Sequence, residues 1–327
     1  MALPLNQPQG RVSLGGVPIG GLIELEVQAP GPFLAGRFSA AFAMGTFPAL
    51  GVGEFAALGN APVVIEISTD GLSYTTLLTG QVENIRVDLA ANTATLQGRD
   101  QTALLIDAEI SESFVNQTAS EIAETIAMRH GLIPNVTQTF PPVGQYYQID
   151  HARTALKIGS RATTEWNLLC RLAEAQQFGV SVSGGALNFG PLAVGMQRPV
   201  TPASFASLQL DLVTALPAAV SVLSWNCRDK MAVSEGVGGG NATNIVRPNL
   251  TAAQASSYAS SMLATVQQHG KVLLGKMPGE TAINVGDALL LVGTNSELDD
   301  SYIVMSLMRR LNGAGGFVQM VKAYAVG

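Results

Sequence analysis

An alternating segment near the N-terminus, "PVVIEIST", constrains the fold of this chain more than any other feature. Successive side chains of a β-strand point to opposite faces, so Val63, Ile65 and Ile67 would share one apolar face. Asp70 and Gly71 follow at once, and glycine accepts the positive φ that a tight hairpin turn requires. Strand and turn together predict antiparallel β structure with one buried face.

Segments of the same kind fill both ends of the chain. Residues 1–110 hold five or six of them, including "LIELEVQ", "RFSAAFAM" and "TATLQGRD". Short strands with close turns are typical of a small barrel or sandwich. The pattern returns in residues 196–327, in "ASLQLDL", "ALLLVG", "SYIVMSLMRRL" and "FVQMVKAYAV". Two β-rich ends predict a duplicated architecture, although the residues themselves show no convincing repeat.

Helical signals appear between these ends. Thr118 and Glu121 have the spacing of a capping box, in which each side chain accepts a hydrogen bond from the other residue's backbone amide. A second helix is expected over "TEWNLLCRLAEAQQF", ending at Gly179, with a hairpin around Gly184-Gly185 after it. Residues 111–195 therefore form a small α/β module. The expected fold class is α+β and mainly β.

A third helix is expected at 251–269, where Thr251 and Gln254 repeat the capping-box spacing. It follows the segment "EGVGGGNATN", which we interpret as a flexible connection because it lacks the Lys-Ser/Thr of a phosphate-binding loop.

Charged residues make up only 13% of the 327 residues, about half the usual share. Such a surface suggests that other subunits cover much of it. The net charge of −6, without any basic block, argues against binding to duplex DNA through its phosphates. The start "MALPLNQPQG" does not resemble a signal peptide, and no apolar run reaches the roughly 18 residues that span a bilayer. Synthesis in the cytoplasm and no stable membrane insertion are expected.

Five residues are candidates for catalysis. A nucleophilic cysteine needs a lowered pKa, from a histidine or a helix N-terminus. Cys170 lies in the body of its helix and Cys227 in a predicted strand, so both are expected to pack. His130 and His269 each precede a capping glycine, where the ring meets the negative end of the helix dipole. His151 follows an aspartate, but adjacent residues of an extended chain point to opposite sides.

Two binding patterns also fail on inspection. "GVGEFA", beginning at Gly51, matches GxGxxA, but Pro48 before it and Asn60 and Pro62 after it leave no room for the helix of a dinucleotide site. Asp299-Asp300 could bind a cation, but a solvated turn is the simpler interpretation. The sequence therefore predicts no catalytic, cofactor-binding or metal site, and no enzyme.

Longer segments carry a family resemblance. The residues that match are Gly98-Arg99-Asp100, Ile106-Asp107, Phe114 through Leu132, Glu165-Trp166, Leu168-Leu169, Leu172-Ala173-Glu174 and Phe189-Gly190-Pro191. "SWNCRDK" and the closing β segments from "MPGETAINVGDALLLVG" onward follow in the same order. Together, over roughly residues 60–325, they resemble the hub proteins of phage tails: the D-type late-control and baseplate hub family, also found in gene transfer agents and tail-like particles.

The resemblance implies a fold and a mechanical role. Residues 1–110 and 196–327 would each form a tube-like antiparallel β-barrel, with 111–195 as an α/β insertion between them. The second barrel would be interrupted, so that about 237–270 could join the middle module. Three chains would form a ring of six barrels that joins the hexameric tail tube to a threefold tip or spike and lets DNA pass without sequence-specific binding.

The implied partners are two further copies of the chain, a tail tube or distal tail protein, a tip or spike protein, and the tape measure protein. The implied location is the tail of a virion or phage-like particle, assembled in the bacterial cytoplasm. Two alternatives stay open. A peptidoglycan hydrolase would need an acid pair or a Cys/His pair, and a carbohydrate-binding tail-tip module would need clustered aromatic residues, which make up only 6% of this chain.

Overall fold

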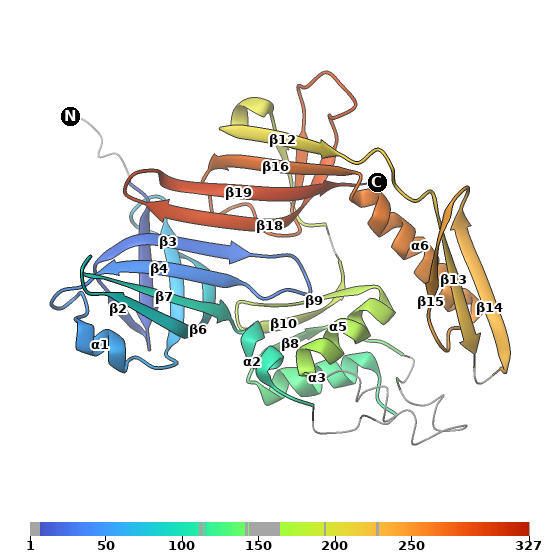
Figure 1. The fold of residues 1–327 in the computed structure, drawn as a ribbon, viewed down its shortest axis with the longest axis horizontal. Helices are drawn as coiled ribbons and strands as arrows, with labels where there is room; N and C mark the ends of the chain where they lie inside the picture. Colours follow the sequence, from blue (N-terminus) through green and yellow to red (C-terminus); the bar gives the residue numbers. More distant parts are fainter. Residues whose placement is uncertain are drawn as a thin grey trace.

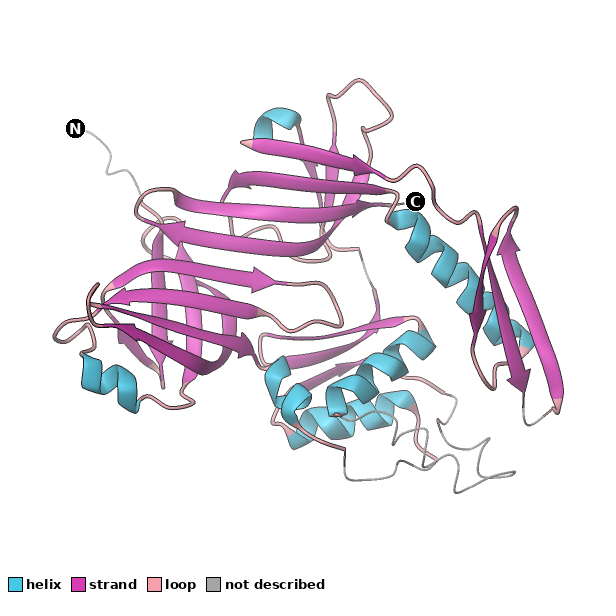
Figure 2. Cartoon of the chain, viewed as in Figure 1, coloured by secondary structure: helices cyan, strands magenta, loops and turns pink. Residues whose placement is uncertain are grey.

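The fold was analysed in a computed structural model, which describes residues 7–110, 114, 116–140, 143, 164–192, 194–226 and 229–326 (Figure 1). Strands dominate the described chain and helices gather in its middle and on one side (Figure 2). The prediction of a mainly β fold with α-helices is confirmed.

The first unit contains seven strands and a short helix, in the sheet order β3-β4-β7-β6-β5-β1-β2. Its elements are β1 (Gln9–Leu14), β2 (Val17–Ile19), β3 (Leu22–Ala29), β4 (Arg37–Ala43), α1 (Val52–Ala57), β5 (Pro62–Ser68), β6 (Thr75–Asp88) and β7 (Thr93–Asp100). The alternation that predicted β5 is confirmed, because Val63, Ile65 and Ile67 are all buried. The expectation of no helix after Gly51 was wrong, since α1 fits before Pro62 and buries Phe55.

The middle module packs helices on a three-stranded sheet of order β8-β10-β9. Its elements are α2 (Thr102–Asp107), α3 (Ala119–Arg129), β8 (Ile133–Val136), α5 (Glu165–Gln176), β9 (Phe178–Ser183) and β10 (Ala186–Pro191). Ile122 and Ile126 of α3, Leu169 of α5 and Phe189 of β10 meet in one apolar core.

Helix ends follow the expected caps with one exception. Thr118 and Glu121 form the predicted capping box. Helix α5 instead ends at Gln177, which adopts a left-handed φ of 59°. Gly179, predicted to end the helix, lies inside β9, where a Cβ would stand 2.4 Å from the Leu192 side chain. Close packing, rather than a helix cap, explains this glycine.

The second unit has the sheet order β12-β16-β19-β18-β17-β11. Its strands are β11 (Gln197–Val200), β12 (Ser207–Leu212), β16 (Lys271–Pro278), β17 (Ala288–Leu291), β18 (Ser301–Asn312) and β19 (Gly316–Ala325), with a 3-10 turn at Pro202–Ser204. A separate layer is inserted between β12 and β16.

The inserted layer consists of β13 (Ala219–Asn226), β14 (Met231–Gly238), β15 (Ala242–Val246) and α6 (Ala252–Gln268). Thr251 and Gln254 form the predicted capping box at the start of α6. The helix packs on β13 and β14 around a core of its own. A hydrogen bond of 2.7 Å from Gln177 Nε2 to Ser257 Oγ joins α6 to the end of α5.

The two β units repeat one strand order. If the strands β1, β3, β4, β5, β6 and β7 are lettered a to f, the first sheet reads a-d-e-f-c-b. The strands β11, β12, β16, β17, β18 and β19, lettered the same way, give the same order. A register shift interrupts strand e of each unit against strand f, after Val82 in β6 and after Val304 in β18. The units differ at the a–d pair, which is antiparallel in the first and parallel in the second.

The units also join edge to edge, because β3 pairs with β18 and makes one continuous sheet (Figure 1). Among the described strands neither unit closes fully into a barrel by hydrogen bonding. The first unit curls strongly, however. β1 returns so close to β3 that a Cβ on Gly10 would meet the Leu22 side chain at 2.8 Å. The first β unit is therefore curled, although its described strands do not close by hydrogen bonding.

Candidate assembly surface

The pairing of β3 with β18 joins the two β units through both polar and apolar contacts. We call this pairing the junction. Residues Leu307–Asn312 pair antiparallel with Glu24–Ala29, nearly 300 positions earlier in the sequence. On the inner face Leu25, Val27 and Leu307 are buried to 3% exposure or less. Burial of these side chains supplies the apolar part of the junction, because each buried aliphatic side chain contributes about 1.5–3 kcal/mol.

The outer face of the junction is polar. Arg310 forms an ion pair with Glu24, and Gln28 Nε2 lies 3.6 Å from Met308 Sδ. Exposed pairs of this kind contribute little to stability, but like charges directly opposite one another are unfavourable, so the pair helps to fix register. The junction thus combines an apolar inner row with charge matching outside.

Arg309 lies on the inner face of the same strand. Its guanidinium donates a hydrogen bond to the Ile283 carbonyl, and its side chain is almost fully buried. Burial lowers the pKa of Arg309 from its usual value, with Glu280 acting in the opposite direction.

The Gly98-Arg99-Asp100 triplet, on which the resemblance partly rests, ties the first unit to the middle module. Arg99 pairs with Glu83 of β6 and, at 3.0 Å, with Asp107 of α2. Asp100 accepts hydrogen bonds from the backbone amides of Gly36 and Thr102, at 2.7 and 2.9 Å. Burial raises the pKa of Asp100 despite these bonds.

Trp166 forms a second tie between the middle module and the first unit. Its indole is 5% exposed in the core of the module, and Nε1 donates to the Phe33 carbonyl at 3.3 Å. Phe33 lies in the connection between β3 and β4. The tryptophan therefore holds the loop that leads out of the junction strand.

The Cys170 thiol is protected rather than activated. Burial, with a smaller contribution from the Glu174 carboxylate, raises its pKa to about 12. Packing against the module core accords with the sequence prediction. Cys227 and His151 lie outside the described residues.

We expect Cys170 to alkylate at least about a hundredfold more slowly in the folded protein than in the unfolded chain at pH 7.5, because the thiolate is the reacting form. Iodoacetamide labelling followed by mass spectrometry of the peptide that carries Cys170 measures the rate. Equal or faster labelling of the folded protein would contradict a partly buried, protonated thiol.

His130 and His269 lie at the C-termini of α3 and α6, as predicted. His130 Nε2 also lies 2.5 Å from an oxygen of Glu165, a buried carboxylate in the first turn of α5 that Arg129 contacts as well. This cluster could not be predicted from the sequence, because nothing in the local pattern brings α3 and α5 together. His269 Nδ1 lies 2.6 Å from the Thr265 carbonyl, a helix-end contact.

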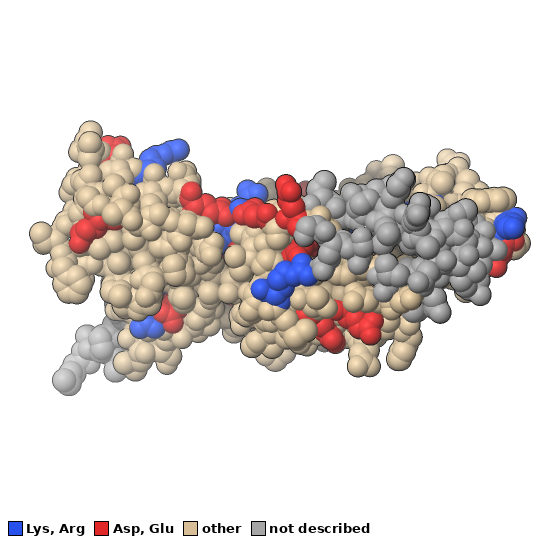
Figure 3. All heavy atoms as spheres, turned by 90° about the horizontal axis from the view of Figure 1, so that it is seen from below, with Lys and Arg blue, Asp and Glu red and all other residues tan. Residues whose placement is uncertain are grey.

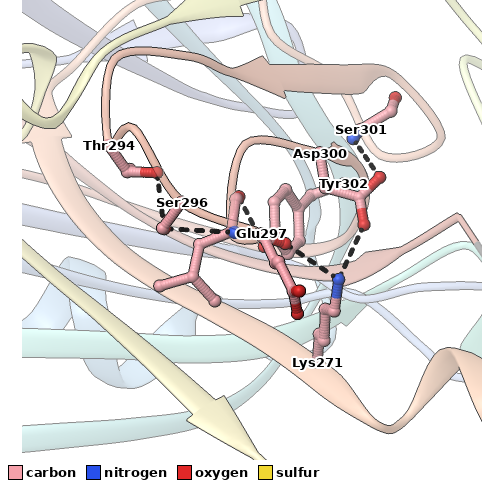
Figure 4. Close-up of polar contacts among 8 residues, drawn as sticks. Lys271, Thr294, Ser296, Glu297, Asp300, Ser301 and Tyr302 are labelled. Atoms are coloured by element: carbon pink, nitrogen blue, oxygen red, sulfur yellow. Dashed lines mark hydrogen bonds and ion pairs between the residues drawn. The ribbon is translucent and has the colours of Figure 1, made fainter.

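Asp299 and Asp300 lie in the turn that follows β17, and Figure 4 shows the contacts of Asp300 with Lys271 of β16 and with Ser301. Asp299 accepts hydrogen bonds from the Thr294 hydroxyl and backbone amide and from the Gly293 amide. These bonds, that of the Thr294 side chain first, lower the pKa of Asp299. Asp300 lies 3.2 Å from Lys271 Nζ. Within the described residues no group of three or more His, Cys, Asp or Glu could hold a metal ion.

On the face shown in Figure 3, acidic and basic side chains form a few small groups among mostly uncharged residues, in the part of the face that is not drawn in grey. Large apolar side chains such as Leu72 and Phe47 are more than four-fifths exposed. In the described part of the chain, no helix combines the length and apolar character needed to cross a membrane.

No protein-family model matches the sequence, and no curated protein matches it either. Solved structures do match. A tail protein from Neisseria meningitidis MC58 has a TM-score of 0.72 at 13% identity, over 98% of this chain and 96% of that one. The 43 kDa tail protein of prophage MuSo2 from Shewanella oneidensis has a TM-score of 0.73 at 15% identity, over 97% and 98%.

A component of the type VI secretion system from E. coli, itself similar to T4 phage tail proteins, has a TM-score of 0.59 at 10% identity, over 97% of this chain and 77% of that one. Identities this low establish the fold alone. The chain therefore has the fold of phage tail and secretion-system tail proteins, as its resemblance to the tail hub family predicted.

Proposed function

We propose that this protein is a structural hub of a phage or phage-like tail, including the tails of gene transfer agents. Three copies would form a ring of six similar β units. The ring would join a hexameric tail tube to a threefold tip or spike. Residues 1–110 and 196–327 would provide the two tube-like barrels of each copy, and 111–195 an outer module.

The observation that carries this proposal is the repeated a-d-e-f-c-b strand order. Two units of one topology in one chain can occupy neighbouring, nearly equivalent positions of a sixfold tube. Three copies of the chain then match six subunits. The edge-to-edge pairing of β3 with β18 supports the same interpretation, because it already arranges two such units side by side.

The partners follow from this position. The ring would contact a tail tube or distal tail protein on one side, a tip or spike protein on the other, and the tape measure protein within. The net charge of −6 would keep passing DNA from adhering, by repulsion between like charges. The place of action would be the assembled tail, after assembly in the bacterial cytoplasm.

Mass measurement tests the stoichiometry. Light scattering coupled to gel filtration, at concentrations into the tens of micromolar, is expected to give three times the chain mass of 34.0 kDa. A monomer throughout that range would contradict the ring.

A non-enzymatic role is part of the proposal. The protonated Cys170 thiol and the hydrogen-bonded Asp299 support it. A cell-wall zymogram tests the alternative of a peptidoglycan hydrolase, and a glycan array tests the alternative of a carbohydrate-binding module. Turnover that disappears on mutation of Cys170 or His151 would replace the structural role with an enzymatic one.

A further inference from the structure

Several described strands have an open edge, and two of these edges lie in strands b and e of the β units. β12 pairs with β16 on one side only. In β6, residues 75–81 pair with β5, whereas Ile85–Asp88 pair only with β7 on the opposite side. Exposed strand edges offer unpaired backbone groups to another chain, and proteins normally cover or protect them.

These two open edges are the counterparts of the strands that meet inside the chain. β12 is strand b of the second unit, as β3 is of the first, and β6 and β18 are the two e strands. When β6 and β18 are aligned at their register shifts, Ile85 becomes the counterpart of Leu307. Their partners, Leu96 of β7 and Val321 of β19, then also occupy equivalent positions. Alignment through β4 and β16 makes Leu210 the counterpart of Val27.

We infer that β12 of one copy adds to the Ile85–Asp88 edge of a second copy of this chain, antiparallel and in the register of the internal junction. The pairs would be Ile85 with Leu212, Arg86 with Asp211, Val87 with Leu210, and Asp88 with Gln209. This inference rests on the proposed ring and names the surface by which its copies join.

Burial supports this assignment. In the internal junction Leu25, Val27 and Leu307 are almost completely covered. Their counterparts Leu208, Leu210 and Ile85 are only partly buried, although each packs on the edge of its own core. Leu212, which would face Ile85, is 53% exposed. Addition of β12 to the β6 edge would cover these side chains, just as the internal junction covers Leu25, Val27 and Leu307.

Charge supports the register. Arg86 and Asp211 lie directly opposite one another only in this alignment, and Asp211 is exposed. They occupy the outer face, where the internal junction holds Arg310 against Glu24. A shift by one residue would place Arg86 opposite an apolar leucine and turn the inner row outward.

The resulting contact joins different surfaces of two copies, head to tail. Such an interface continues from copy to copy until the ring closes. With internal and intermolecular junctions of one kind, every β unit of the ring would meet its neighbours through strands b and e. Backbone hydrogen bonds would provide affinity, and the Arg86–Asp211 pair would oppose misaligned contacts.

A charge-reversal cycle tests the inference on the full-length protein. Arg86→Asp and Asp211→Arg each place like charges opposite one another at every intermolecular junction, and are expected to weaken trimer formation by about tenfold or more. The double variant Arg86→Asp/Asp211→Arg restores opposite charges and is expected to recover most of the trimer. Arg171→Asp, an exposed reversal on α5, is the matched control.

Mass by light scattering across a concentration series provides the readout, and circular dichroism checks that each variant is folded. A wild-type trimer that both single reversals leave intact would overturn this register while the proposed ring stands. Weakened singles without rescue in the double variant would also overturn the assigned pair. A wild-type monomer would overturn the ring and this inference together.

Discussion

Replacement of Trp166 by alanine is expected to lower the free energy of unfolding by about 3–5 kcal/mol, the usual cost of removing a large buried aromatic side chain. The indole is 5% exposed and lies among Leu169 and Phe189 in the core of the middle module. Its loss also leaves the Phe33 carbonyl without its indole donor. Denaturant unfolding followed by far-UV circular dichroism gives the difference.

Trp166→Phe separates the two contributions, because it keeps an aromatic ring and removes only the Nε1 hydrogen bond. Its expected cost is smaller, about 1 kcal/mol for the hydrogen bond together with a modest packing loss. Assembly should fail in Trp166→Ala to the extent that folding fails. An alanine variant of unchanged stability would show that the indole does not hold the module together.

Gly98→Ala is the second change with a large expected effect, a loss of about 3 kcal/mol in the free energy of unfolding. A Cβ at this position would lie 1.9 Å from the Gln81 carbonyl oxygen and 2.8 Å from the Phe38 ring. Gly98 pairs with Val82 at the register shift of β6, where the backbone of the two strands approaches closely. The backbone would have to move, because a carbonyl oxygen cannot turn aside as a flexible side chain can.

Gly53→Ala is the matched control. Gly53 lies within α1, a Cβ added there would meet no neighbouring atom within 4 Å, and its φ is not positive. Alanine in a helix is favoured over glycine by about 0.8–1.0 kcal/mol, so this variant should be as stable as the wild type or more so. If both variants kept wild-type stability in thermal unfolding, close approach would not be the reason for glycine at position 98.

Local structure could largely be predicted from the sequence. Capping boxes are recognised within four residues, so Thr118 and Thr251 were placed correctly. The hairpin at Gly184-Gly185 was also correct, since both residues have positive φ. Gln177 shows the limit of such rules, because it adopts a left-handed φ although its residue type does not favour that conformation.

Contacts between distant segments could not be predicted. The pairing of Glu24–Ala29 with Leu307–Asn312 cannot be recognised in either segment alone, because each has the sequence pattern of an ordinary strand. The cluster around Glu165 depends on two helices that meet only in the folded module. The repeat was visible only as two β-rich ends, since its strand order, not its residues, is shared.

The central claim is that each copy contributes two equivalent β units to one ring. End-on electron-microscopy averages of the purified assembly test it most directly. We predict threefold symmetry with a strong sixfold component around the opening, because the two units of each copy alternate. Averages that show only two equivalent β units around the opening, or a ring that lacks the sixfold component, would contradict a ring built from two equivalent β units of each copy.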